Sequence, residues 1–150
     1  MATDIAALCS QNLSYVTIEQ NNVLSCASNT HGVRETFKIW WIEGGGPLPH
    51  GRLHLTTPET SESAGSVVKL SNEILILEGV VASGLPGASV SIFGGLNDLD
   101  VFNYVWWGDE SKISLQAQNG FYVSAYNGGG AWISVNKREV GEWEKFALYL

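Results

Sequence analysis

The sequence predicts an all-β fold of three pseudo-symmetric units with four strands each, and internal repetition is the main observation behind this prediction. The N-terminal and C-terminal segments carry two copies of one pattern, and a weaker copy lies between them, where 52–56 resembles 112–116 and 100–102 resembles 144–146. Self-similarity at such a period is the signature of a repeat architecture. The aligned pairs are Leu8/Leu115, Gln11/Gln118, Asn12/Asn119, Tyr15/Tyr122, Val16/Val123, Ser25/Ser134, Gly32/Gly141, Glu35/Glu144 and Phe37/Phe146.

Strand and turn signals in the last unit predict the four strands. Residues 113–115 alternate in polarity, as expected of a half-buried strand. Asn119-Gly120 is a hairpin signal. The glycines of 127–130 predict a second turn, and the remaining strands are expected at 121–125, 132–135 and 142–148. Four strands in each of three units give twelve in the chain.

Three such units that close on themselves predict a β-trefoil, a six-stranded barrel capped by three hairpins. Closure removes sheet edges that would otherwise pair with other chains. The whole chain, 1–150, is predicted to be one domain with units near 5–49, 50–110 and 111–150. The middle unit is longer than the others, and its excess is assigned to loops at 57–65 and around 84–87, which are rich in Pro, Ser, Thr or Gly.

Recurring apolar positions predict the core. A buried free thiol is expected at Cys26, because the repeat aligns it with Val135, and two cysteines do not make a disulfide framework. Each Trp-Trp pair, at 40–41 and 106–107, is expected to place one ring in the core. The predicted core comprises Leu8, Tyr15, Val16, Phe37, Leu53, Leu55, Phe102, Leu115, Tyr122, Trp143 and Phe146.

Composition narrows the classes of partner. The chain has 17 glycines, 15% charged residues and a net charge of −7. An acidic surface argues against nucleic acid and anionic membranes, which bind through Lys and Arg. No apolar run is long enough for membrane insertion, and the N-terminus lacks the features of a signal peptide. We therefore expect a cytoplasmic protein, with release by a non-classical route left open.

The third unit also resembles a known family. Residues 119–130 (NGFYVSAYNGGG), followed by Val-Asn-Lys-Arg at 135–138 and Gly-Glu-Trp-Glu-Lys-Phe at 141–146, are similar to the fascin-like (actin-crosslinking) β-trefoil repeat. The resemblance is specific over 113–148. It weakens in the first unit, where Arg34 replaces the motif tryptophan, and in the middle unit, which keeps only the acid-x-Phe ending. The resemblance implies the fold, and a core role for Trp143, but not by itself actin binding.

No pattern of catalytic or metal-ligating residues stands out. His31, His50 and His54 lack the further ligands that a metal site needs, and Cys26 has no histidine partner in the pattern. No phosphate-binding glycine motif joins a strand to a helix. We therefore predict a binding protein that is not an enzyme and uses no cofactor or metal.

Two aromatic residues suggest what is bound. Tyr126 and Trp132 fall outside the core register on either side of the turn at 127–130, near Asn127 and Asn136. An aromatic face can stack on the C–H face of a sugar while amides bind its hydroxyls. The alternative is a hairpin cap that covers the barrel. The first unit has Glu19 and Val23 at the positions of the pair, so a single glycan site is predicted.

Three functions follow in order of preference. The first is lectin-like binding of a glycan or glycoprotein at Tyr126, Asn127, Trp132 and Asn136. The second is inhibition of a protease by a loop, 44–51 or 57–65, with Pro47 and Pro49 stiffening the former. The third is actin binding, which is the least favoured because the chain has only eight basic residues and a single trefoil. A homodimer is left open.

Overall fold

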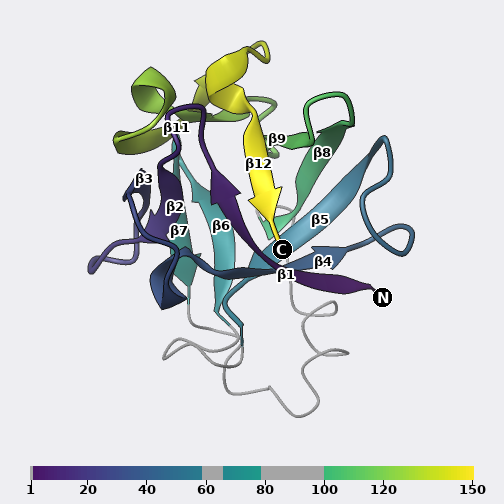
Figure 1. Cartoon of the computed structure of the whole chain (residues 1–150), viewed down its shortest axis with the longest axis horizontal. Helices are drawn as coiled ribbons and strands as arrows, with labels where there is room; N and C mark the ends of the chain where they lie inside the picture. Colours follow the sequence, from purple (N-terminus) through teal and green to yellow (C-terminus); the bar gives the residue numbers. More distant parts are fainter. Residues whose placement is uncertain (1, 59–65, 79–99) are drawn as a thin grey trace.

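The computed structural model describes residues 2–58, 66–78 and 100–150, and these form twelve strands and three short 3-10 helices (Figure 1). Residues 59–65 of the expected loop at 57–65, and the expected loop around 84–87, lie outside the described residues. The strands are β1 Thr3–Cys9, β2 Tyr15–Ile18, β3 Leu24–Ser28, β4 Phe37–Trp41, β5 His50–Thr56, β6 Val67–Ser71, β7 Ile74–Glu78, β8 Phe102–Trp107, β9 Lys112–Gln116, β10 Tyr122–Ala125, β11 Ala131–Lys137 and β12 Phe146–Tyr149. The 3-10 helices are η1 Val33–Glu35, η4 Tyr126–Gly128 and η5 Glu142–Glu144.

Six strands form a closed antiparallel ring. β1 pairs with β4, β4 with β5, β5 with β8, β8 with β9, β9 with β12, and β12 returns to β1. The other six form the hairpins β2–β3, β6–β7 and β10–β11. The fold is a β-trefoil. This confirms the architecture predicted from the repeat.

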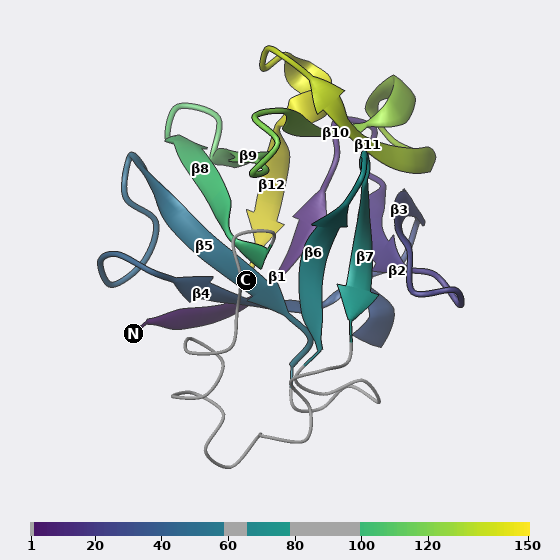
Figure 2. The same cartoon turned by 180° about the vertical axis from the view of Figure 1, so that it is seen from behind.

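The three hairpins meet one another through backbone contacts. Both views show β11 beside β3, where Trp132 lies opposite Ser25 (Figures 1 and 2). Val23 forms the corresponding bridge with Ile76 of β7. The Val135 N–H donates to the Glu73 carbonyl at 2.8 Å, which joins the third hairpin to the second. The units therefore support one another across their boundaries.

The core follows the repeat with one clear exception. Of the predicted core residues, Tyr15 and Tyr122 are half-buried and Trp143 is exposed, while the other eight are buried. Cys26 is a fully buried free thiol, as predicted, and burial raises its pKa to about 11. Trp40 and Trp41 are both buried, whereas Trp106 and Trp107 are both half-buried, so neither pair divides cleanly between core and surface.

The placement of Trp143 in the core was wrong, and a local turn explains why. Residues 142–144 form η5 instead of the first half of a strand, which begins only at Phe146. In this turn the carboxylate of Glu144 points inward. Its two oxygens accept hydrogen bonds from the Gly141 N–H at 2.7 Å and the buried Ser124 hydroxyl at 2.5 Å. With Glu144 facing inward, Trp143 faces outward.

The first unit repeats this arrangement. Glu35 in η1 accepts hydrogen bonds from the Gly32 N–H at 2.8 Å and from the Thr17 hydroxyl. Arg34 then occupies the outward place that Trp143 has in the third unit, and it too is exposed. None of the helices among the described residues is long and apolar enough to cross a membrane.

Candidate functional site

The candidate site is built on the turn between β10 and β11. Tyr126 and Asn127 lie in η4, and Asn127 adopts a left-handed backbone with φ of 56°. The turn is held against the first unit, because the Asn12 side-chain amide donates to the Asn127 carbonyl at 2.9 Å. A Cβ on Gly129 would lie only 2.2 Å from the Ser10 Oγ, so the backbone packs here too closely for any side chain.

Three aromatic rings gather beside this turn. The Tyr126 and Trp132 rings stack with centroids 4.1 Å apart and an interplanar angle of 20°. The Trp143 ring lies near the Tyr126 ring, and their centroids are 6.5 Å apart. The exposed fractions are 37% for Tyr126, 59% for Trp132 and 39% for Trp143. We call these three residues the aromatic platform.

The exposure of the platform bears on the alternative interpretation of the pair. A hairpin cap that closes the barrel would bury its rings against the core, whereas more than half of the Trp132 side chain meets solvent. The residues beneath the turn, Val123, Ala125 and Ile133, already close this part of the core. The rings are therefore additional to the core packing of the hairpin.

The two predicted amides are placed differently. Asn127 is exposed and directly follows Tyr126, so it lies at the edge of the platform. Asn136 is also exposed, but it lies four residues along β11 from Trp132, which corresponds to about 13 Å in a strand. The structure therefore stacks Tyr126 on Trp132, keeps Asn127 beside Tyr126 in the turn, and separates Asn136 from the Trp132 ring.

The acidic side chain that precedes Trp143 is paired with lysines. Glu142, next to Trp143, lies 3.8 Å from the ammonium groups of both Lys112 and Lys145. Lys145 also forms an ion pair with Glu110 at 2.6 Å, and this hydrogen bond raises the pKa of its ammonium. A neutral, hydroxyl-bearing ligand fits such a surface better than a highly charged one.

Sequence reasoning did not place Trp143 beside Tyr126 and Trp132, although a signal for its exposure was present. The repeat aligns Trp143 with Arg34, and a core position does not exchange tryptophan for arginine. The contribution of Asn12 depends on contact between the first and third units, which no local pattern reveals.

Comparisons with known proteins support the fold. No family model matches the chain, and no curated protein matches it. Among solved structures, the chain is similar to ThreeFoil, a designed three-fold symmetric protein, with a TM-score of 0.69 and 14% sequence identity. The match covers 97% of this chain and 98% of ThreeFoil. At this identity the likeness shows the shared fold alone.

Proposed function

We propose that this protein is a non-catalytic, lectin-like protein that binds a glycan on the aromatic platform. The observation that supports the proposal is the stacked and exposed Tyr126–Trp132 pair, extended by Trp143. Stacked rings present a flat, rigid apolar surface, which suits the C–H face of a sugar ring. Asn127 at the edge supplies an amide that can donate to one hydroxyl and accept from another.

The geometry assigns a role to each residue of the platform. Trp132 provides the most exposed ring and stacks on the sugar, while Tyr126 supports it from its other face. Trp143 borders Tyr126 and contributes lateral contact. The turn is fixed by Asn12 and by the close packing at Gly129, so little ordering is needed when the ligand binds.

A glycan array followed by calorimetric titration of the selected glycans tests this proposal. Trp132→Ala should weaken binding by about tenfold or more, because one exposed stacking ring is lost. Trp143→Ala should also weaken binding while the protein stays folded, since Trp143 is exposed. Tyr149→Ala is the matched control, because Tyr149 is 44% exposed but lies on β12, outside the platform.

Glycan binding at full strength by a folded Trp132→Ala variant would contradict the proposal. Equal losses in Trp132→Ala and Tyr149→Ala would show a general effect of removing surface aromatics.

The fascin-like affiliation is supported by the sequence motifs of the third unit, and actin binding is the least favoured function for a chain with so few basic residues.

Loop-based protease inhibition is the second candidate, and one observation favours it. Leu48, in the loop that follows β4, is 38% exposed while its backbone N–H donates to the Tyr104 hydroxyl at 3.0 Å. An exposed side chain on an anchored backbone is what an inhibitory loop presents to an enzyme cleft. Titration of a protease panel tests it, and loss of inhibition in Leu48→Asp would support this function over glycan binding.

A further inference from the structure

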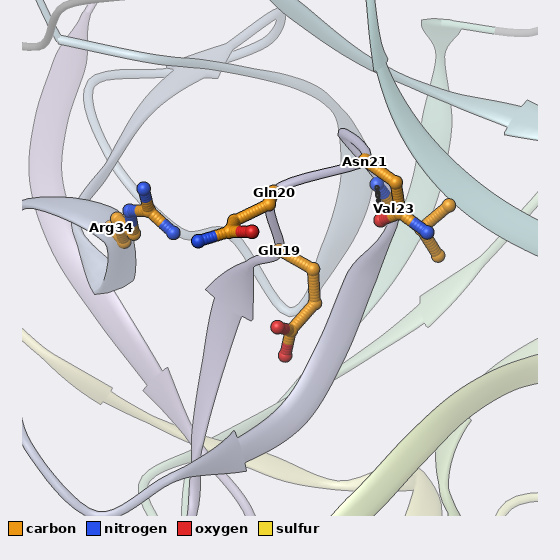
Figure 3. Close-up of a pocket in the computed structure, with 5 residues that line it drawn as sticks. All are labelled: Glu19, Gln20, Asn21, Val23 and Arg34. Carbon is orange, nitrogen blue, oxygen red and sulfur yellow. Dashed lines mark hydrogen bonds between the residues drawn. The ribbon is translucent and has the colours of Figure 1, made fainter.

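The first unit carries a hollow where the third unit carries its aromatic platform. The hollow has a volume of about 540 Å³ and is lined by Glu19, Gln20, Asn21, Val23 and Arg34 (Figure 3). The repeat aligns Glu19 with Tyr126, Val23 with Trp132 and Arg34 with Trp143. The same place in the fold therefore holds three aromatic rings in one unit and a carboxylate, a valine and a guanidinium in the other.

The hollow offers a mixed set of hydrogen-bonding groups. Figure 3 shows the Arg34 and Gln20 side chains extending toward one another, with Glu19 pointing away from them. The Glu19 Oε2 accepts a hydrogen bond from the Ser25 hydroxyl, which leaves Oε1 as an acceptor. Arg34 forms no ion pair with any carboxylate among the described residues. Its guanidinium therefore remains available as a donor.

These groups favour a neutral ligand that carries neighbouring hydroxyls. The single negative charge of Glu19 and the single positive charge of Arg34 balance, so the hollow gives a charged ligand no net attraction. A carboxylate only accepts hydrogen bonds, a guanidinium only donates them, and an amide does both. A sugar diol, in which each hydroxyl donates and accepts, satisfies all three kinds of group.

The hollow adjoins the aromatic platform through the contact between β3 and β11. Trp132 and Ser25 are directly opposite in this antiparallel pair. Opposite residues project from the same face, with Cβ atoms about 4.5–5.5 Å apart. Because the Ser25 hydroxyl in turn binds Glu19, the platform and the hollow share a border at Ser25.

We infer that the platform and the hollow form one extended site for a neutral oligosaccharide. One sugar residue stacks on Trp132, and a neighbouring residue places its hydroxyls against Glu19, Gln20 and Arg34. This inference rests on the proposed function and adds the ligand class, an oligosaccharide rather than a monosaccharide. It also replaces the single site within the third unit by one that two units build together.

Dependence of affinity on chain length tests the inference. The probes are galactose, N-acetyllactosamine and its dimer, together with N-acetylglucosamine and its β1,4-linked oligomers of two to four residues. In at least one series the wild-type protein should bind the longer glycans about tenfold more tightly than the monosaccharide, since hydrogen bonds to charged groups are added. Arg34→Met should remove this gain and leave the monosaccharide affinity unchanged.

A control variant shows whether the effect of Arg34→Met is specific to the hollow. Arg138→Met is the control, because Arg138 is also exposed and forms no ion pair among the described residues, yet it lies outside the hollow. If Trp132→Ala weakens binding but Arg34→Met keeps the gain with chain length, the extended site is wrong and the proposed function stands. If no probe binds, the extended site is wrong, and the proposed function is wrong with it only when the glycan array is also negative. If Trp132→Ala binds every probe like the wild type, the proposed function and the extended site are both wrong.

Discussion

Replacing Glu144 by alanine should destabilise the protein strongly, although glutamate is usually a surface residue. Glu144 is only 6% exposed, and its carboxylate accepts hydrogen bonds from the Ser124 hydroxyl and the Gly141 N–H. Hydrogen bonds to a charged group contribute about 1.5–3 kcal/mol each, and a buried donor left without a partner costs a further 1–3 kcal/mol. Because these terms overlap, the expected loss in unfolding free energy for Glu144→Ala is about 3–5 kcal/mol.

Urea denaturation followed by tryptophan fluorescence measures this loss. Glu144→Gln should cost about 1 kcal/mol, because the amide oxygen can still accept from Gly141 and the Ser124 hydroxyl can accept from the amide NH₂. Glu142→Ala is the neighbouring control and should cost less than about 0.5 kcal/mol, since the Glu142 side chain is 49% exposed and its ion pairs are long, at 3.8 Å. Glu35→Ala should behave like Glu144→Ala, because in the first unit Glu35 accepts from the Thr17 hydroxyl and the Gly32 N–H, the equivalents of the two partners of Glu144.

A loss below about 1 kcal/mol for Glu144→Ala would refute this reasoning, because the buried carboxylate would then contribute no more than an ordinary hydrogen bond. A large difference between the Glu35→Ala and Glu144→Ala variants would refute the equivalence of the two units.

Three further predictions concern the turn, pH and the thiols. Gly129→Ala should lower the unfolding free energy by about 2–4 kcal/mol, because a Cβ at this position overlaps Ser10 Oγ. Thermal melts measure this loss, and adding Ser10→Gly to the Gly129→Ala variant should restore part of the lost stability. Burial holds the pKa of the His54 imidazole below its usual 6.5. The unfolded chain therefore takes up this proton more readily, and melting temperature should fall as pH drops below about 6.5, less steeply in His54→Gln than in a His31→Gln control. The thiols of Cys9 and Cys26 are both buried and have raised pKa values. A thiol reagent at mildly alkaline pH should therefore label neither cysteine in the native protein and both in urea. Rapid labelling of the native protein would contradict their burial.

The sequence was sufficient to predict the fold because the repeat relates whole four-stranded units to one another. Positions such as Phe37 and Phe146 recur because each unit must fill one third of the same barrel, and both are buried as predicted. The strand boundary near Trp143 was not predictable from alternation alone. It depends on a carboxylate that turns inward and binds Ser124, twenty residues earlier in the chain.

The candidate site was only partly predictable for the same reason. Tyr126 and Trp132 stand out locally because they break the core register around a glycine turn. The hollow around Arg34 and its border with Trp132 depend on pairing between β3 and β11, which are more than 100 residues apart in sequence. Such contacts between units follow from the closed fold and are not encoded by a local motif.

The most direct test of glycan binding on the platform is the response of the six tryptophan indole N–H signals in a ¹H–¹⁵N correlation spectrum during glycan titration. Each signal is assigned by single substitution. The account predicts that the indole signals of Trp132 and Trp143 shift in a saturable manner, while that of Trp41, which is fully buried, does not move. Saturable binding that leaves the Trp132 and Trp143 signals in place would show that the glycan binds elsewhere on the protein and would contradict the account.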